Sequence, residues 1–129
     1  MSNPAFAFPV RIYYEDTDAG GVVYHANYLR FMERARTECL RMHGYELNRL
    51  EQEHGFLFAV RSANIDYIKP ARLNDLLSIQ VAIARTGKAS LDIDHEVYRD
   101  DELLCRARIK LAGITVDSFR PMALPFTLD

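Results

Sequence analysis

One stretch of this chain has helical periodicity, and the other patterned stretches alternate with a period of two. Apolar residues recur at three- and four-residue spacing from Tyr28 to Met42, with charged residues between them. This spacing predicts a single amphipathic helix over residues 25–43, about 28 Å long at 1.5 Å per residue. Gly44 follows as a natural C-terminal stop. Because one helix cannot cover both faces of a sheet, any sheet built by this chain keeps an uncovered face or edge, which favours an oligomer.

The alternating stretches lie on both sides of the predicted helix. They cover residues 6–14, 56–67, 77–84, 90–97 and 103–111, and their period of two is typical of half-buried strands. Gly113 is expected to mark a bulge, and residues 46–54 are expected to hold a short helical turn. The order of strand, helix and then about four antiparallel strands predicts an α+β fold in one domain over residues 1–129.

Composition excludes several classes of function. The 129 residues carry a net charge of −2, so the chain as a whole has no attraction to nucleic acid or to an anionic membrane. Cys39 and Cys105 are far apart in the sequence, which argues against a disulfide framework and favours a reducing compartment. No apolar run approaches the length of a membrane span, and Met1 to Phe6 lack the pattern of a secretory signal. We therefore expect a cytoplasmic protein with no membrane span and no nucleic-acid partner.

The densest polar cluster lies where the first strand leads into the helix. It contains Glu15, Asp16, Asp18, His25 and Asn27, set around Gly20 and Gly21. The glycines let backbone approach a ligand closely, and the start of a helix offers free N–H groups at the positive end of its dipole. Asp18 beside such groups has the makings of an acyl-transfer site, with the carboxylate as base or nucleophile and the N–H groups as oxyanion donors.

Other interpretations of these residues stay open. An Asp before two glycines is also typical of an ordinary turn or a helix cap. A metal site at Glu15, Asp16 and Asp18 is the weaker alternative, because no complete calcium-binding loop follows. Basic residues on the later strands and turns either face water or receive phosphates. His95 lies on an apolar strand face, which is typical of a core histidine whose hydrogen bonds are satisfied.

Longer runs of sequence resemble a known family. Residues 14–38, YEDTDAGGVVYHANYLRFMERARTE, closely resemble the signature of the hot-dog-fold acyl-CoA thioesterases. The likeness is to the 4-hydroxybenzoyl-CoA thioesterase family, nearest to its Tol-Pal-associated, YbgC-like branch. Further matches are IDYIKPARLND at 65–75, RTGKASL at 85–91 and RPMALP at 120–125. The resemblance implies an antiparallel sheet of about five strands wrapped around one long central helix, with two subunits joining their sheets.

The resemblance also implies roles for particular residues. Asp18 would be the catalytic carboxylate, assisted by His25, and an N–H of His25 or its neighbour would polarise the thioester carbonyl. The residues expected to bind the substrate are Gly20, Gly21, Tyr24 and Asn27 near the acyl group, and Arg72, Arg85, Lys88 and Arg120 for the phosphates of CoA. The 4-hydroxybenzoyl branch usually has Trp-Tyr-Pro where this chain has Tyr24-His25-Ala26, and that departure favours a short aliphatic acyl group over an aromatic one.

The sequence therefore predicts an acyl-CoA thioesterase that works as a homo-oligomer, either a dimer or a tetramer, without a cofactor or metal. An acyl-carrier protein or an envelope-associated protein is a further expected partner. Two alternatives remain. A hot-dog dehydratase acting on a 3-hydroxyacyl thioester would pair a histidine with a carboxylate, and both residue types are present. A non-catalytic module that binds acyl-CoA or a protein would keep the fold without turnover.

Overall fold

The computed structural model describes residues 6–128. Residues 1–5 and 129 lie outside the described residues, and with them most of the N-terminal segment assessed above for a secretory signal. The elements are β1 (Phe6–Arg11), the short 3₁₀ helix η1 (Tyr14–Asp16), α1 (Asn27–Met42), α2 (Leu47–His54), β2 (Phe56–Tyr67), β3 (Leu76–Thr86), β4 (Ser90–Arg99) and β5 (Glu102–Thr115). The strands form one antiparallel sheet in the order β1-β3-β4-β5-β2. The predicted α+β fold is confirmed.

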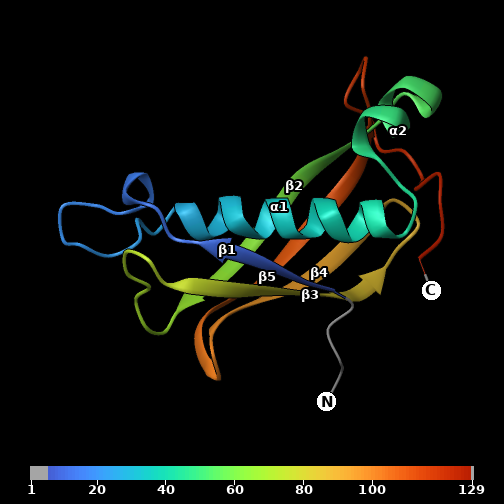
Figure 1. The fold of residues 1–129 in the computed structure, drawn as a ribbon. Coiled ribbons are helices and arrows are strands. Elements are labelled where there is room, and N and C mark those ends of the chain that lie inside the picture. The colour runs from blue at the N-terminus through green and yellow to red at the C-terminus, as the bar shows by residue number, and fades with distance from the viewer. Residues whose placement is uncertain (1–5, 129) are drawn as a thin grey trace.

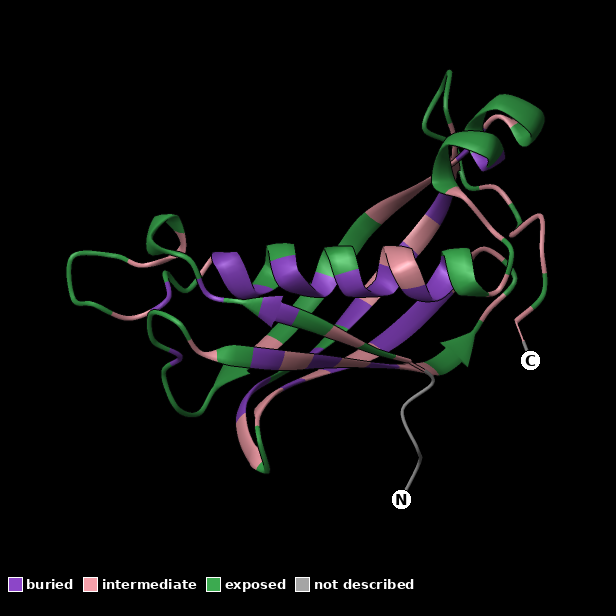
Figure 2. Cartoon of the chain, viewed as in Figure 1, coloured by how far each residue is buried: buried purple, intermediate pink, exposed green. Residues whose placement is uncertain are grey.

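The helix α1 lies across one face of the sheet (Figure 1). Its buried apolar residues are Tyr28, Phe31, Met32, Ala35, Cys39 and Leu40, and Figure 2 shows this buried side toward the sheet and the exposed side away from it. Burial of apolar surface, at roughly 25 cal/mol per Å², is the main force that holds the helix on the sheet. Among the described residues, neither helix has the length and apolar character needed to cross a membrane.

The helix is shorter than the sequence predicted. It begins at Asn27 rather than at residue 25. The residues just before it form a tight turn, in which the N–H of Asn27 donates to the C=O of Tyr24 at 2.9 Å. Its 16 residues end at Met42, which gives about 24 Å at 1.5 Å per residue. Gly44 follows with φ +94°, and the predicted stop at this glycine is confirmed.

Two other boundaries differ from the prediction. The first predicted strand, residues 6–14, is too long: β1 ends at Arg11, and Tyr14 lies outside it with 82% of its surface exposed. The chain turns into η1 there, because the carboxylate of Asp16 accepts the N–H of Tyr13 at 2.8 Å. Residues 46–54, expected to hold only a helical turn, contain the eight-residue helix α2, which Gly55 ends in the left-handed conformation at φ +64°.

Gly113 does not mark a bulge, contrary to the prediction. The pairing of β2 with β5 is regular at Gly113 and shifts instead between Val60 and Ser62. A Cβ at Gly113 would lie 2.5 Å from the C=O oxygen of Met122 and 2.6 Å from a ring carbon of Phe56. Close packing of backbone and an aromatic ring therefore requires the glycine.

His95 is fully buried, as predicted, but its hydrogen bonds are not satisfied as predicted. It lies on β4 near the backbone of Met32 on α1 and of Ile93, but neither ring nitrogen has a partner with hydrogen-bond geometry within residues 6–128. Burial lowers the pKa of the imidazole to about 3, and the positive charge of Arg36 on α1 lowers it further, against the opposing effect of Asp94. The ring is therefore neutral in the folded protein near pH 7.

Candidate active site

The approach to α1 is a tight loop that projects beyond the end of the sheet (Figure 1). Thr17 and Val23 form an antiparallel bridge across its base. The N–H of Gly21 donates to the C=O of Asp18 at 3.0 Å, and the N–H of Asp18 donates to the C=O of Val22 at 2.9 Å. Gly21 has φ +82°, a conformation that glycine adopts without strain. These bonds hold residues 17–23 in an ordered turn, with Asp18 and the two glycines at its tip.

Asp18 occupies this loop with one carboxylate oxygen committed and one free. Oδ1 accepts the N–H of Gly20 at 2.8 Å, an Asx-type turn. Oδ2 makes no hydrogen bond within residues 6–128, and the residue is exposed. The sequence left a turn residue and a reacting carboxylate as alternatives, and this geometry accommodates both, because the free oxygen retains its lone pairs for a water or a carbonyl carbon.

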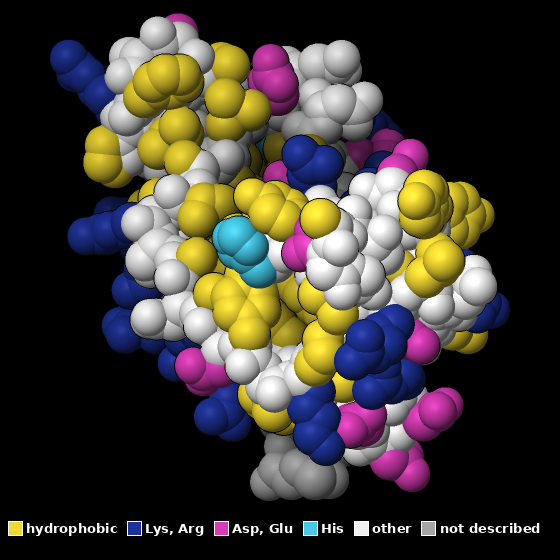
Figure 3. All heavy atoms as spheres, turned by 90° about the vertical axis from the view of Figure 1, so that its left-hand side faces the viewer, with side chains coloured by type: hydrophobic (Ala, Val, Ile, Leu, Met, Phe, Trp, Pro, Cys, Tyr) yellow, Lys and Arg dark blue, Asp and Glu magenta, His cyan; other side chains and the backbone are white. Residues whose placement is uncertain are grey.

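His25 lies beside a cavity at the N-terminal end of α1. The cavity has a volume of about 260 Å³ and is lined by Val23, His25, Tyr28, Tyr67, Ile68, Lys69 and Pro70. Figure 3 looks onto this end of the molecule and shows a histidine among apolar side chains, with an acidic side chain close to it and the lysine and arginine side chains farther out. The ring of Tyr24 packs on that of His25 with centroids 4.6 Å apart. Asp18 is not among the residues that line the cavity.

Two successive backbone N–H groups before α1 are available to a ligand. The N–H groups of His25 and Ala26 have no acceptor within residues 6–128. The carbonyls of the same peptide groups are occupied: the C=O of Tyr24 accepts from Asn27, and the C=O of His25 accepts the hydroxyl of Tyr67 at 2.9 Å. Free N–H groups at the positive end of a helix suit an oxyanion.

Asn27 and Asp16 hold the backbone of this region together. The buried side chain of Asn27 donates to the C=O of Asp16 at 2.9 Å, and the same oxygen accepts the N–H of Tyr24 at 2.9 Å. These bonds tie η1 to the start of α1. The carboxylate of Asp16 accepts the N–H of Tyr13. Within the described part of the chain, no three side chains that could bind a metal ion lie together.

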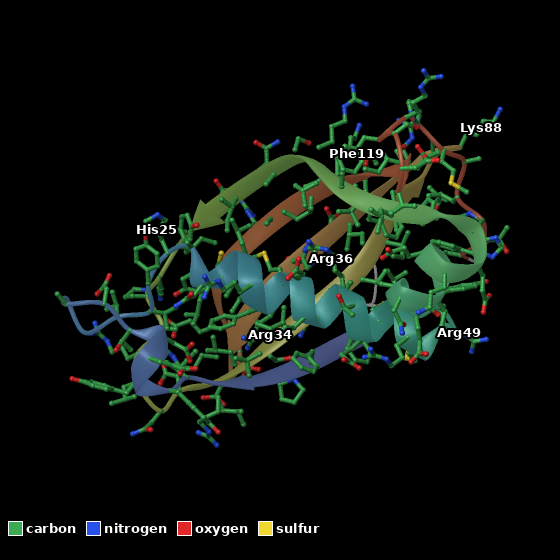
Figure 4. The ribbon with its side chains drawn as sticks, turned by 90° about the horizontal axis from the view of Figure 1, so that it is seen from above. His25, Arg34, Arg36, Arg49, Lys88 and Phe119 are labelled. Atoms are coloured by element: carbon green, nitrogen blue, oxygen red, sulfur yellow. The ribbon has the colours of Figure 1, made fainter. Side chains whose placement is uncertain are left out.

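The basic residues predicted to bind phosphate do not come together in one chain. Arg72 is near the loop, because its backbone pairs with that of Val22. Arg85 and Lys88 belong to the end of β3 and the turn after it, and Arg120 follows β5. Figure 4 shows Lys88 and His25 at opposite ends of the molecule.

The contact that Tyr67 makes was not foreseen from the sequence. Its hydroxyl bonds the backbone of His25, 42 residues earlier in the chain. The available signal was the run IDYIKPA, which resembled the family without indicating what its tyrosine contacts.

The sequence of this chain is also similar to those of known proteins. The family model described as the thioesterase superfamily matches residues 20–106. The chain is 42% identical over 125 residues to the Haemophilus influenzae protein named acyl-CoA thioesterase YbgC, covering 97% of this chain and 92% of that protein. A Helicobacter pylori protein of the same name is 34% identical over 124 residues, with 89% and 90% of the two chains covered.

The fold agrees as well. A crystal structure of a probable thioesterase from Bartonella henselae superposes with a TM-score of 0.87 at 35% identity, covering 92% of this chain and 98% of that one. The predicted hot-dog arrangement, a curved antiparallel sheet around one helix, is confirmed. From the family model, the relatives and the shared fold together, the chain belongs to the thioesterase superfamily.

Proposed function

We propose that this protein is an acyl-CoA thioesterase that hydrolyses its substrate to a free acid and CoA. The observation that carries the proposal is the pair of unoccupied N–H groups of His25 and Ala26 beside an apolar cavity. The loop leading to them carries Asp18 with a free carboxylate oxygen. The 42% identity to a protein named as an acyl-CoA thioesterase supports the same activity.

In the proposed reaction, the thioester carbonyl accepts hydrogen bonds from the N–H groups before α1. Asp18 either removes a proton from the attacking water or attacks the carbonyl carbon itself, giving a mixed anhydride that water then opens. The oxygen develops negative charge in either case, which the N–H groups stabilise more strongly than the neutral carbonyl. If Asp18 acts as the base, the C–S bond breaks after water has attacked, and the proton that Asp18 took from the water passes to the departing sulfur. If Asp18 attacks directly, the C–S bond breaks as the anhydride forms, the thiolate of CoA takes a proton from solvent, and water opens the anhydride afterwards. His25 assists by a hydrogen bond to the water, the carbonyl or the departing sulfur.

The proposed substrate carries a short aliphatic acyl group. Ligand pockets commonly measure roughly 300–1,000 Å³, and the cavity beside His25 is about 260 Å³. That volume suits a short acyl chain but not a complete acyl-CoA, so the nucleotide part lies outside it. Gly20, Gly21, Tyr24 and Asn27 are proposed to shape the surroundings of the acyl group through the backbone that they hold.

A homodimer is the proposed working unit, because β2 is an open edge of the sheet. β2 has 12 residues and no partner on its outer side within the described part of the chain. Val60 on this strand is 56% exposed, and an apolar groove separates the strand from α1, lined in part by Leu29, Val60 and Ala63. Long exposed edges pair readily with a second copy, and a two-fold axis makes such a pairing close on itself.

Antiparallel pairing of two β2 strands would also complete the phosphate site. β2 starts beside the end of β5, where Thr115 bonds the backbone of Arg120, and it finishes at Tyr67 near His25. In an antiparallel pair, the start of one strand lies alongside the end of the other. The end carrying Arg120, with Lys88 and Arg85 nearby on the sheet, would then approach the His25 end of the second copy and join Arg72 there.

The proposed location is a reducing compartment such as the cytoplasm. Cys39 and Cys105 are both buried and free, and burial raises the pKa of the Cys105 thiol to about 12. Both cysteines therefore behave as small apolar core residues rather than as reactive thiols.

The activity is tested by release of free thiol from a panel of substrates. The panel contains short-chain, long-chain and benzoyl-CoA, an enoyl-CoA and a short-chain acyl-carrier protein. We expect the highest kcat/KM for short-chain saturated acyl-CoA. Hydration of enoyl-CoA without thiol release would instead identify a dehydratase, and tight binding without thiol release would identify a binding module.

The dimer is tested by light scattering after gel filtration. The variant Val60→Glu places a charge on the open edge and is expected to dissociate the oligomer. Leu76→Glu is the matched control, because Leu76 is 51% exposed but lies on the inner strand β3. A wild-type chain that elutes as a monomer at assay concentrations would contradict the proposed dimer.

A further inference from the structure

β2 ends at Tyr67, and this side chain reaches across to the backbone just before α1. Its hydroxyl donates to the C=O of His25 at 2.9 Å. Its ring meets the ring of His25 edge-on, with centroids 6.1 Å apart at 87°, and the ring of Tyr28 at 5.6 Å and 68°. A residue of the sheet therefore holds the backbone that precedes the helix.

The end of β2 is itself firmly supported. The N–H groups of Ile68 and Lys69 both donate to the C=O of Leu104 on β5, at 2.9 and 3.0 Å. Tyr28 is only 3% exposed, and its hydroxyl accepts the N–H of Ala71 at 3.1 Å. The backbone that follows Tyr67 is therefore fixed by hydrogen bonds to β5 and to the buried side chain of Tyr28.

The bond from Tyr67 constrains the peptide groups on either side of His25. A trans peptide group is planar, so its N–H points away from its C=O, and the described residues contain no cis peptide bond. The C=O of Tyr24 is held by Asn27 at 2.9 Å, which directs the N–H of His25. The C=O of His25 is held by Tyr67, which directs the N–H of Ala26. The directions of the two free N–H groups are therefore set by the hydrogen bonds that the C=O groups of the same peptide units accept.

We propose that Tyr67 is a positioning residue for thioester hydrolysis, which acts through the backbone of His25 to aim the oxyanion donors. The inference rests on the proposed thioesterase activity. A hydrogen bond to a peptide C=O also polarises the peptide group and strengthens its N–H as a donor. Without the hydroxyl, the C=O of His25 loses its partner and gains freedom to turn toward the substrate oxygen, where two negative partial charges repel each other.

The consequence falls on the transition state more than on substrate binding. The substrate oxygen carries more negative charge in the transition state than in the bound thioester, so misaimed donors lower kcat more than they raise KM. Removal of a complete oxyanion donor costs about 10²–10³-fold in kcat. Tyr67→Phe leaves both donors in place and only loosens them, so we expect kcat to fall about tenfold with KM within about twofold.

The test compares Tyr67→Phe with Tyr45→Phe in the intact protein. Tyr45 is a matched control, because its hydroxyl also donates to a backbone C=O, that of Thr127 at 3.2 Å, and its ring also stacks on an aromatic residue. Tyr45→Phe is expected to keep the wild-type kcat. Affinity for an unreactive ketone analogue, in which CH₂ replaces the thioester sulfur, reports ground-state binding and shows that each variant is folded. This affinity is expected to be the same in Tyr67→Phe and Tyr45→Phe as in the wild type.

A double variant separates the backbone of His25 from its imidazole. In the His25→Ala background the backbone C=O remains, so Tyr67→Phe is expected to cause the same fold loss of kcat there as in the wild type. A loss that disappears in that background would overturn the assignment to the backbone. An unchanged kcat in Tyr67→Phe, or a raised KM with weaker ketone binding, would overturn the positioning role. Failure of the wild type to release thiol would instead refute the proposed activity, and that assay comes first.

Discussion

The carboxylate of Asp18 holds the N–H of Gly20 through Oδ1 at 2.8 Å, and its second oxygen has no partner within residues 6–128. The same side chain therefore shapes the loop and keeps an oxygen available for chemistry. An asparagine in its place would retain the amide oxygen that accepts from Gly20 but would lose the negative charge. This relationship makes it possible to separate the two roles by substitution.

Asp18→Asn is expected to keep the loop and lose the activity. Removal of a catalytic base lowers the rate by about 10²–10⁴-fold, and we expect a loss of kcat in that range for thiol release from short-chain acyl-CoA. Asp117→Asn, an exposed acid beyond the end of β5, is the matched control and should keep the wild-type rate. Wild-type hydrolysis by Asp18→Asn would remove Asp18 from the mechanism and leave it as a turn residue.

His25→Ala is expected to reduce turnover less than Asp18→Asn does. A hydrogen bond to a developing charge is worth about 1.5–3 kcal/mol, so a loss of about 10- to 150-fold in kcat is expected. His54→Ala at the exposed end of α2 serves as the control. An unchanged kcat in His25→Ala would show that the imidazole takes no part, while the backbone N–H groups would still be available.

Arg99 is expected to support the loop between β2 and β3. Its guanidinium bonds Asp75 at 2.7 Å and Glu102 at 2.6 Å, with only 27% of the side chain exposed. We expect Arg99→Met to lower the melting temperature by about 4 °C. Arg106 pairs with Asp66 at 3.3 Å but is 59% exposed, so Arg106→Met should shift it by less than about 1 °C, as is usual for surface pairs. Equal shifts in the two variants would contradict this difference.

His95 is expected to make the protein less stable in mild acid. Its pKa is lowered to about 3 by burial, with a further contribution from Arg36 on α1, while Asp94 beside it on β4 opposes the shift. The unfolded chain binds a proton at His95 below about pH 6.5, and the folded protein does not do so until about pH 3. The stability contributed by the neutral ring is therefore complete above pH 6.5 and is lost as the pH falls from 6.5 toward 3.

The measurement is urea unfolding at pH 7.5 and pH 5, at one protein concentration. Between these values the linkage removes about 2 kcal/mol of unfolding free energy from the wild type. His95→Leu lacks the group that titrates, so its unfolding free energy is expected to fall less over the same interval. An identical fall in wild type and variant would show that His95 gains a proton as readily in the folded state as in the unfolded one.

Local periodicity predicted most of the secondary structure, because burial of one face imposes a spacing on each element separately. The spacing from Tyr28 to Met42 predicted α1 to within two residues, and the alternation over residues 56–67 coincides with β2. The pattern failed at Tyr14, where a side-chain bond from Asp16 to the backbone of Tyr13 ends the extended conformation. It also failed at Gly113, where the reason for glycine is a contact with Met122 and Phe56.

Local patterns were enough to predict an amphipathic helix packed on an antiparallel sheet, and the long run over residues 14–38 was enough to indicate the family. Which groups meet at the start of α1 follows from the way the strands are arranged in space. Tyr67 reaches His25 because β2 ends at that edge of the sheet, and the order β1-β3-β4-β5-β2 sets Arg72 apart from Lys88. Periodicity reports which face of an element is buried. Strand order and register decide which ends of distant elements become neighbours.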